Sequence, residues 1–154
     1  MLTQEDVLSA YLKPEQVLFL DADRQEEIIK QMVEHLVHQK LIDDQESFLK
    51  AIMAREALVS TGVGRGSAIP HAKSHQLKEF FVSIAVIKKP GVDWKSFDQV
   101  PVTVVVLIGG PANDPNRYLK ILSAITMAIR SDDFRQDLAY CKTAQEVLKL
   151  FERN

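Results

Sequence analysis

The pattern of apolar positions along the chain predicts several amphipathic helices. In the clearest of these, apolar residues return about every 3.6 positions, as Ile28, Ile29, Met32, Val33, Leu36 and Val37. Asp23 followed by Glu26 is a capping pattern and predicts where this helix begins. A second helix, capped around Asp43 and Glu46, is expected to end near Leu58. We expect these two consecutive helices to form a hairpin.

Four further helices are predicted, one before the strands and three after them. A short helix over about 4–12 carries apolar residues on one face and stops before Pro14. Asp114-Pro115 is a cap followed by proline at the first helical position, which predicts a helix through Arg130. Shorter helices are expected near 133–140 and over 143–151.

Runs of β-branched and apolar residues predict the strands. Residues 80–87 and 102–108 are almost continuously apolar, which is typical of strands covered by helices on both faces. Residues 17–20 predict a first strand, and 88–94 contain a Pro-Gly turn that predicts an additional edge strand. The fold class expected is α/β. Residues 1–154 are predicted to form one single-domain sandwich, with a mixed central β-sheet flanked by helices on both faces.

Composition and charge exclude several classes of function. The chain has 154 residues, of which 46% are hydrophobic, and a formal net charge of -2. It shows no nucleic-acid footprint, and its apolar runs are too short for direct membrane insertion. Without a basic signal region at the N-terminus, we expect a cytoplasmic protein. The single cysteine, Cys141, excludes an internal disulfide or a cysteine-based metal cluster, and it is expected to be a semi-buried helix residue.

A glycine-rich segment carries the most specific chemistry. Three alternate glycines at 62, 64 and 66 precede Ile69-Pro70-His71. No Gly-Lys-Ser/Thr follows, and the segment comes after a predicted helix rather than a strand, so both nucleotide-binding patterns fail. Glycine lets main-chain N–H groups approach an anion, and nearby arginines add positive charge. The candidates for holding a phosphoryl group in this loop are Thr61, Gly64, Arg65, Gly66 and Ser67.

His71 is the candidate reactive residue. Proline fixes its own φ and favours an extended conformation for the residue before it, so Ile69-Pro70 presents the imidazole from a stiff segment. Imidazole is a good nucleophile near neutral pH, and its two nitrogens can take separate roles. His71 and His75 have the spacing of a helical metal pair, but no carboxylate lies between them and Lys73 adds repulsive charge, so a metal is not expected. Since both nucleotide-binding patterns fail, no cofactor is expected either.

Other polar residues fit plainer roles. His35 and His38 lie in a predicted helix among charged and apolar neighbours, where surface histidines are common. The chain has no Gly-x-Ser-x-Gly elbow, so Ser60 and Ser67 are expected to be hydrogen-bonding loop residues rather than hydrolase nucleophiles.

The segment from Arg55 to Lys73, which reads REALVSTGVGRGSAIPHAK, resembles the active-site signature of the type-2 enzyme IIA family of the phosphoenolpyruvate-dependent phosphotransferase system. That family includes mannitol- and fructose-class sugar components and nitrogen-class regulatory proteins. The segments 91–94, 100–108 and 119–123 are similar to family segments as well, so the resemblance spans essentially the whole chain.

The resemblance implies a role for several residues. His71 would take a phosphoryl group on Nε2 from the phosphohistidine of HPr or of its nitrogen-branch paralogue. Arg55 would lie near the site, where its charge favours the phosphorylated form, and Arg65 is a further candidate. Tyr118 stands where many family members have a second active-site histidine. A phenol can donate a hydrogen bond to a phosphoryl oxygen, but it cannot carry an imidazolium charge.

The resulting interpretation is a phosphocarrier that exchanges a phosphoryl group with partner proteins. The glycine loop favours the nitrogen-regulatory branch, in which a regulatory target protein lies downstream. The alternative is a fructose- or mannitol-specific component that passes phosphate to a IIB component. Because Tyr118 replaces the second histidine, a binding module that keeps the fold without phosphorylation is a third possibility, and a hydrolase is a fourth.

Overall fold

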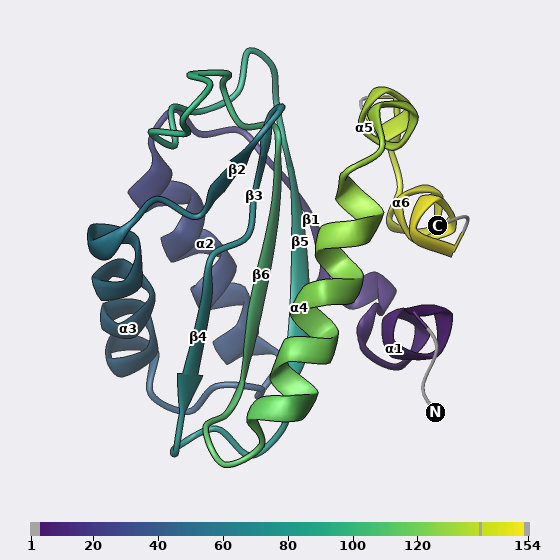
Figure 1. The fold of residues 1–154 in the computed structure, drawn as a ribbon. Coiled ribbons are helices and arrows are strands. Elements are labelled where there is room, and N and C mark those ends of the chain that lie inside the picture. Colours follow the sequence, from purple (N-terminus) through teal and green to yellow (C-terminus); the bar gives the residue numbers. More distant parts are fainter. Residues whose placement is uncertain (1–3, 139, 153–154) are drawn as a thin grey trace.

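The computed structural model describes residues 4–138 and 140–152, in which a mixed six-stranded sheet lies between two layers of helices (Figure 1). The strands are β1 (Val17–Leu20), β2 (Gly62–Gly64), β3 (Ser67–Ala68), β4 (His71–Ser74), β5 (Phe81–Ile87) and β6 (Val104–Pro111). The helices are α1 (Gln4–Tyr11), the 3-10 turn η1 (Pro14–Gln16), α2 (Gln25–His38), α3 (Gln45–Leu58), α4 (Pro115–Ile129), α5 (Asp132–Leu138) and α6 (Ala144–Glu152).

The sheet has the order β1-β5-β6-β3-β2, and β4 pairs with β6 as a continuation of the β3 pairing. Strand β1 is parallel to β5, and β5 is antiparallel to β6. Both β3 and β4 are parallel to β6, with Ser67 opposite Val104 and His71 opposite Ile108. The predicted mixed sheet is therefore confirmed.

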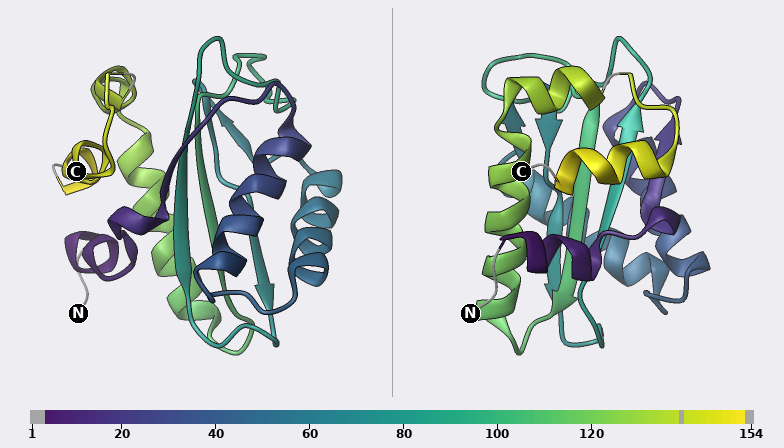
Figure 2. Two further views of the ribbon diagram at one scale, coloured as in Figure 1. Left: turned by 180° about the vertical axis from the view of Figure 1, so that it is seen from behind. Right: turned by 90° about the vertical axis from the view of Figure 1, so that its right-hand side faces the viewer.

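Strand β6 separates two hydrophobic cores because alternate side chains point to opposite faces of the sheet. Val104, Val106 and Ile108 pack with apolar residues of α1, α4, α5 and α6. Val105 and Leu107 pack on the other face, with α2 and α3. Figure 2 shows α2 and α3 covering one face, while α1, α5 and α6 cross the other. This two-sided burial confirms the interpretation of the continuous apolar runs.

The predicted helical hairpin of α2 and α3 is confirmed, but both predicted caps are displaced by one residue. The N-cap of α2 is Arg24, which makes no side-chain capping bond, rather than Asp23. The N-cap of α3 is Asp44, whose carboxylate accepts from the Ser47 backbone N–H, rather than Asp43. Asp43 and Asp44 give the same sequence signal, so only the backbone conformation decides which of them caps α3. The predicted caps Asp114 and Thr143 are confirmed, and each accepts from a first-turn N–H.

Three local predictions are wrong. Residues 88–94 form no strand, because only an isolated bridge joins Val92 to Val102 there. The stretch 60–74, expected to be a loop, instead contains β2, β3 and β4. Cys141 is partly buried, but it lies between α5 and α6 rather than within a helix.

Two predictions extend to parts of the chain outside the description. On the first predicted helix, the side chain of Val7, one of its apolar residues, is not described. Helix α5 is described as far as Leu138 and Tyr140 lies in a turn, so only residue 139 of the helix expected near 133–140 lies outside the description. Within the described ranges, no helix combines the length and apolarity needed to cross a bilayer.

Candidate functional site

The site is built on a strand that is interrupted in the middle. Ser67 and Ala68 pair with Val104 and Val105, and pairing resumes with His71 opposite Ile108, in an unchanged register. Proline has no N–H for a ladder bond, so the interruption falls at Pro70. Its carbonyl still accepts from the Ile108 N–H at 3.0 Å. His71 is therefore fixed to the central strand by its neighbour as well as by its own pairing.

The His71 ring is oriented by one hydrogen bond. Its Nδ1 lies 2.7 Å from the Ile69 carbonyl oxygen. A carbonyl only accepts hydrogen bonds, so Nδ1 must carry the proton and Nε2 keeps a free lone pair. The half-buried imidazole thus presents Nε2 as a nucleophile.

Tyr118 and Lys73 lie beside this ring. The Tyr118 and His71 ring centroids are 6.1 Å apart, and the Lys73 Nζ lies 5.3 Å from the Tyr118 ring centroid. Lys73 follows His71 by two positions in β4, so both side chains point to the face covered by α4. No described residue hydrogen-bonds to the Tyr118 hydroxyl, although the residue is buried. Burial raises the pKa of this phenol, so it stays protonated and able to donate.

The electrostatics of the site favour a neutral imidazole. Desolvation by burial is the largest cause that lowers the pKa of His71 below its usual 6.5, and the Arg55 and Lys73 charges lower this pKa further. The Ile69 hydrogen bond and the Glu56 charge act in the opposite direction. The Arg55 charge also opposes the rise in the Tyr118 pKa, so it affects the titration of both His71 and Tyr118. The guanidinium is held at the end of α3 by a 2.7 Å bond to the Val59 carbonyl.

Glu56, next to Arg55, is the centre of a polar network that fixes the start of the glycine segment. Its carboxylate accepts from the Thr61 hydroxyl, and from the Thr61 N–H at 3.1 Å. Gln25 of α2 and the indole N–H of the buried Trp94 also donate to it, at 3.2 and 3.3 Å. Thr61 is thus a structural neighbour of the site, tied to Glu56 and to Trp94.

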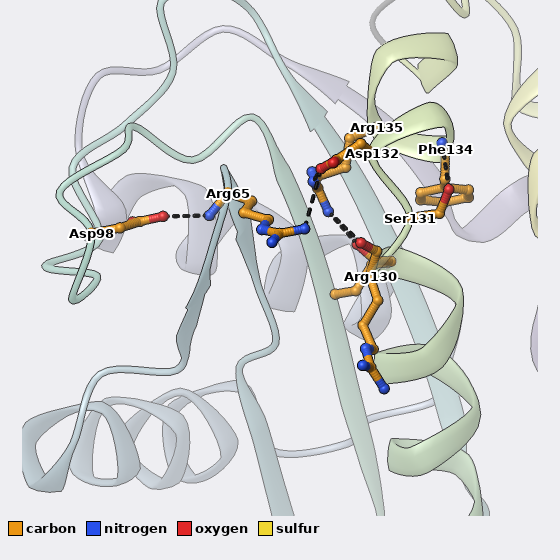
Figure 3. Close-up of polar contacts among 8 residues, drawn as sticks. Arg65, Asp98, Arg130, Ser131, Asp132, Phe134 and Arg135 are labelled. Atoms are coloured by element: carbon orange, nitrogen blue, oxygen red, sulfur yellow. Dashed lines mark hydrogen bonds and ion pairs between the residues drawn. The ribbon is translucent and has the colours of Figure 1, made fainter.

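The glycine segment forms a β-hairpin, with Arg65 and Gly66 at the turn. Both residues have positive φ, 57° and 85°, as a type I′ hairpin turn requires. In Figure 3 Arg65 points toward Asp132 of α5, and its guanidinium lies 3.3 Å from that carboxylate. Its backbone N–H donates to Asp98 at 2.6 Å.

The structure does not bring this turn to the imidazole. Ser67 pairs four positions before His71 along β6, which corresponds to about 13 Å of strand, and the turn lies beyond Ser67. Gly64, Arg65 and Gly66 are therefore grouped with Asp98 and Asp132. Ser67 is buried, and its hydroxyl has no hydrogen-bond partner among the described residues.

The remaining histidines lie apart from this arrangement. The His35 Nε2 bonds to the Glu15 carbonyl at 2.6 Å, while His38 and His75 are exposed. Among the described residues, no group of three or more histidine, cysteine or acidic side chains could hold a metal ion.

Sequence reasoning did not identify Lys73 or Glu56 as site residues. Lys73 could have been found from the two-residue period if 71–74 had been predicted as a strand. Glu56 gave no comparable signal, because its partners Gln25, Thr61 and Trp94 come from three separate segments.

Three exposed apolar residues lie close in sequence to Arg55 or Tyr118, and we call them the apolar rim: Leu58, Val59 and Leu119. Leu58 ends α3 and is 79% exposed, Val59 follows it, and Leu119 adjoins Tyr118 on α4 and is 59% exposed. Large exposed apolar side chains are suited to docking a protein partner, since docking removes them from water.

Comparison with known proteins identifies relatives of the chain. The family model described as "Phosphoenolpyruvate-dependent sugar phosphotransferase system, EIIA 2" matches residues 10–154. The fructose-specific EIIA component of Haloferax volcanii is 33% identical over 106 residues, covering 69% of this chain and 68% of that protein. The chain spans only 12% of the multiphosphoryl transfer protein of Shigella flexneri and 21% of the fructose-specific EIIABC component of Bacillus subtilis.

Solved structures share the fold. The nitrogen regulatory protein IIA-Ntr from Neisseria meningitidis superposes with a TM-score of 0.86 at 23% identity, covering 94% of this chain and 99% of that one. The mannitol enzyme IIA of Escherichia coli, solved in a complex with phosphorylated enzyme IIB, gives a TM-score of 0.78 at 22% identity, covering 93% and 98%.

The electrostatics of the site lead to a prediction for the His71 titration. An NMR titration of the imidazole nitrogens should give a His71 pKa below its usual 6.5. Arg55→Ala should raise this pKa, because removing a nearby positive charge makes protonation easier. The exposed Arg24→Ala removes the same charge at the start of α2 and should leave the His71 pKa unchanged. A His71 pKa that does not rise in Arg55→Ala contradicts this description of the site.

Proposed function

The chain belongs to the EIIA type-2 family of the phosphoenolpyruvate-dependent sugar phosphotransferase system, and from this membership we propose that His71 is the residue on which it carries phosphate. Members of this family are phosphotransferase components that take part in phosphohistidine transfer. One observation supports the assignment above all others. The Ile69 carbonyl holds the Nδ1 proton, so Nε2 is left as the free nucleophile of a half-buried ring.

The transfer needs alignment more than acid–base catalysis. The Nε2 lone pair forms a bond to phosphorus while the P–N bond of the donor phosphohistidine breaks, and that electron pair returns to the donor imidazole. Because the transition state is loose, positioning and charge stabilisation supply most of the catalysis. The phosphorylated ring gains positive character at Nδ1–H, so the bond to the Ile69 carbonyl becomes stronger as the transfer proceeds.

Three side chains can stabilise the phosphoryl oxygens on Nε2. Arg55 and Lys73 supply positive charge, and both already lower the pKa of His71. Lys73 lies over the Tyr118 ring, so its ammonium is held on the His71 side of β4. The Tyr118 hydroxyl stays protonated and lacks a partner among the described residues, which leaves it free to donate to a phosphoryl oxygen.

Partner proteins meet the site through its apolar rim. Leu58, Val59 and Leu119 can be covered when a partner docks, which excludes water from the labile P–N bond during transfer. The phosphoryl donor is HPr or its nitrogen-branch paralogue. The acceptor is a IIB component or a regulatory target. The partner chain in the mannitol IIA complex supports the first of these acceptors.

The downstream branch is a separate part of the proposal. The 33% identity to a fructose-specific EIIA component favours a sugar-class component that passes phosphate to IIB. Nitrogen regulation, predicted from the glycine segment, stays a prediction, because the similarity to IIA-Ntr at 23% identity concerns the fold alone. An unphosphorylated binding module is disfavoured by the oriented imidazole.

His71→Ala should abolish phosphoryl labelling after incubation with phosphoenolpyruvate, enzyme I and a carrier. The reason is that the Ile69 carbonyl holds the His71 Nδ1 proton and leaves its Nε2 as the free nucleophile. His75→Ala, which removes an exposed histidine four positions away, should label like the wild type. Labelled phosphate that remains on His71→Ala, or that maps to His35, His38 or His75, would show that the assignment is wrong.

Tyr118→Phe should slow phosphoryl transfer by the equivalent of about 1.5–3 kcal/mol, the value of one hydrogen bond to a charged group. The ring and its packing are retained, so the unfolding midpoint in urea should change little. Tyr118→His restores a donor at this position and should transfer faster than Tyr118→Phe. Normal transfer by Tyr118→Phe combined with lower stability would assign Tyr118 to helix packing alone.

The two branches differ in their carrier. Parallel labelling reactions with HPr and with its nitrogen-branch paralogue, at equal concentrations, should favour HPr if the chain serves sugar transport. His71→Ala is the control for background labelling in both reactions. Faster labelling by the paralogue would replace the sugar-class proposal with nitrogen regulation, and it would leave the assignment of His71 intact.

A further inference from the structure

A pocket of about 390 Å³ opens at the end of the sheet nearer α5, apart from His71. Its floor is apolar, with Val86 of β5, Val104 of β6 and Leu138 of α5. Phe19 of β1, which is 45% exposed, adds an aromatic wall. The volume lies within the range of small-molecule sites, roughly 300–1,000 Å³.

The position of the pocket in the sheet suits a ligand site. The parallel strands β1 and β5 both end there, since their last residues Leu20 and Ile87 line it. Sites outside the carboxyl ends of parallel strands are common in α/β folds because the connections diverge there. Val104 precedes the His71 partner Ile108 by four positions along β6, about 13 Å of strand, so the pocket and the phosphoryl site are separate.

Positive charge dominates the rim of the pocket. Lys88, Lys89 and Arg135 line it together with a single carboxylate, Asp21. The Lys88 Nζ and the Asp21 carboxylate are 3.7 Å apart, but both side chains are largely exposed, so this pair is weak. Cations therefore outnumber carboxylates among the residues that line the pocket, although the whole chain has a formal net charge of -2.

Arg135 is the most buried of these cations, with a side chain that is 13% exposed. One guanidinium nitrogen donates to the Ile129 and Arg130 carbonyls, and the other terminal nitrogen pairs with Asp132 (Figure 3). Asp132 also pairs with Arg65, so two guanidinium groups share one carboxylate. A guanidinium has five N–H donors, and these bonds leave some of them for an anion.

From these observations we propose that this pocket binds a small amphipathic organic anion, with its apolar body on the Val86–Val104–Leu138 floor and its acidic group between Lys88, Lys89 and Arg135. The apolar floor and aromatic wall favour a ligand with a ring or short hydrocarbon portion, because a fully hydrated inorganic anion would leave that surface in water. The three cations select a negative group. Nothing in this site depends on the chemistry at His71.

Naphthalenesulfonate, which joins an aromatic body to one anionic group, is a suitable probe. In an NMR titration of nitrogen-labelled protein, we expect saturable shifts at the amides of Phe19, Val86 and Thr103, which line the pocket. The combined variant Lys88→Glu/Lys89→Glu should weaken binding at least roughly tenfold, because it replaces attraction by repulsion. Both lysines are exposed, so the variant should remain folded.

Controls separate the alternatives. Lys30→Glu reverses an exposed charge on α2, outside the pocket, and should bind the probe like the wild type. Inorganic phosphate and neutral naphthol should each bind at least roughly tenfold more weakly than the probe. Phosphate lacks the apolar body that would cover the floor, and naphthol lacks the anionic group that would meet the cations. Equal binding by either compound, unchanged binding by the double variant, or shifts centred on His71 would overturn the proposal. The double variant should still accept phosphate on His71, so this test is independent of the proposed transfer function.

Discussion

The pairing of residues 67–74 along β6 is the constraint on which the site depends. The register of β3 and β4 against this strand is the same on either side of the interruption at Pro70. Alternation along an extended chain therefore directs Ile69, His71 and Lys73 to the face covered by α4. A shift of one residue would turn the imidazole toward α3 and away from Tyr118. Such a shift is disfavoured because it would move Ile69 out of the core beneath α4 and exchange it with Ala68 and Ala72, which are buried on the other face.

The Ile69 carbonyl explains how the imidazole is held, because it accepts from the His71 ring. The Ile69 N–H donates to the Thr61 carbonyl, while the Thr61 N–H donates to Glu56 rather than back to Ile69. Among the described strands β4 pairs with β6 alone, so it forms an edge. An edge also leaves Nε2 accessible to a partner protein, which a central strand would not allow. The network around Glu56 fixes the chain on the other side of the hairpin, where Thr61 is tied to α3 and to Trp94. The ring itself is oriented by the Ile69 carbonyl, and the network fixes the segment that precedes it.

The sequence by itself determined the layers of the fold and pointed to His71 as the candidate reactive residue. Continuous apolar runs predict β5 and β6 because a strand that is buried on both faces has apolar side chains at every position rather than at alternate ones. The period of the apolar residues, and caps such as Asp114, predict the helices because these signals are local. Ile69-Pro70-His71 made this imidazole a candidate because proline restricts the backbone whatever surrounds it. Local signals were weaker for α2 and α3, where neighbouring residues compete to cap.

The resemblance pointed to Arg55 and Tyr118, but only the tertiary structure decided that Lys73 lies beside His71 and that the glycine turn does not. The glycine segment was predicted to hold phosphate, yet its turn forms a hairpin that packs near Asp98 and Asp132, because pairing with β6 carries it away from the ring. Lys73 and Tyr118 meet across the space between β4 and α4, although 44 positions of sequence separate them in the printed chain. Contacts of this kind depend on strand order and helix packing, which involve distant segments at once. A local pattern can therefore point to a candidate reactive histidine, whereas Lys73, whose charge lowers the His71 pKa, is placed beside it only by the tertiary structure.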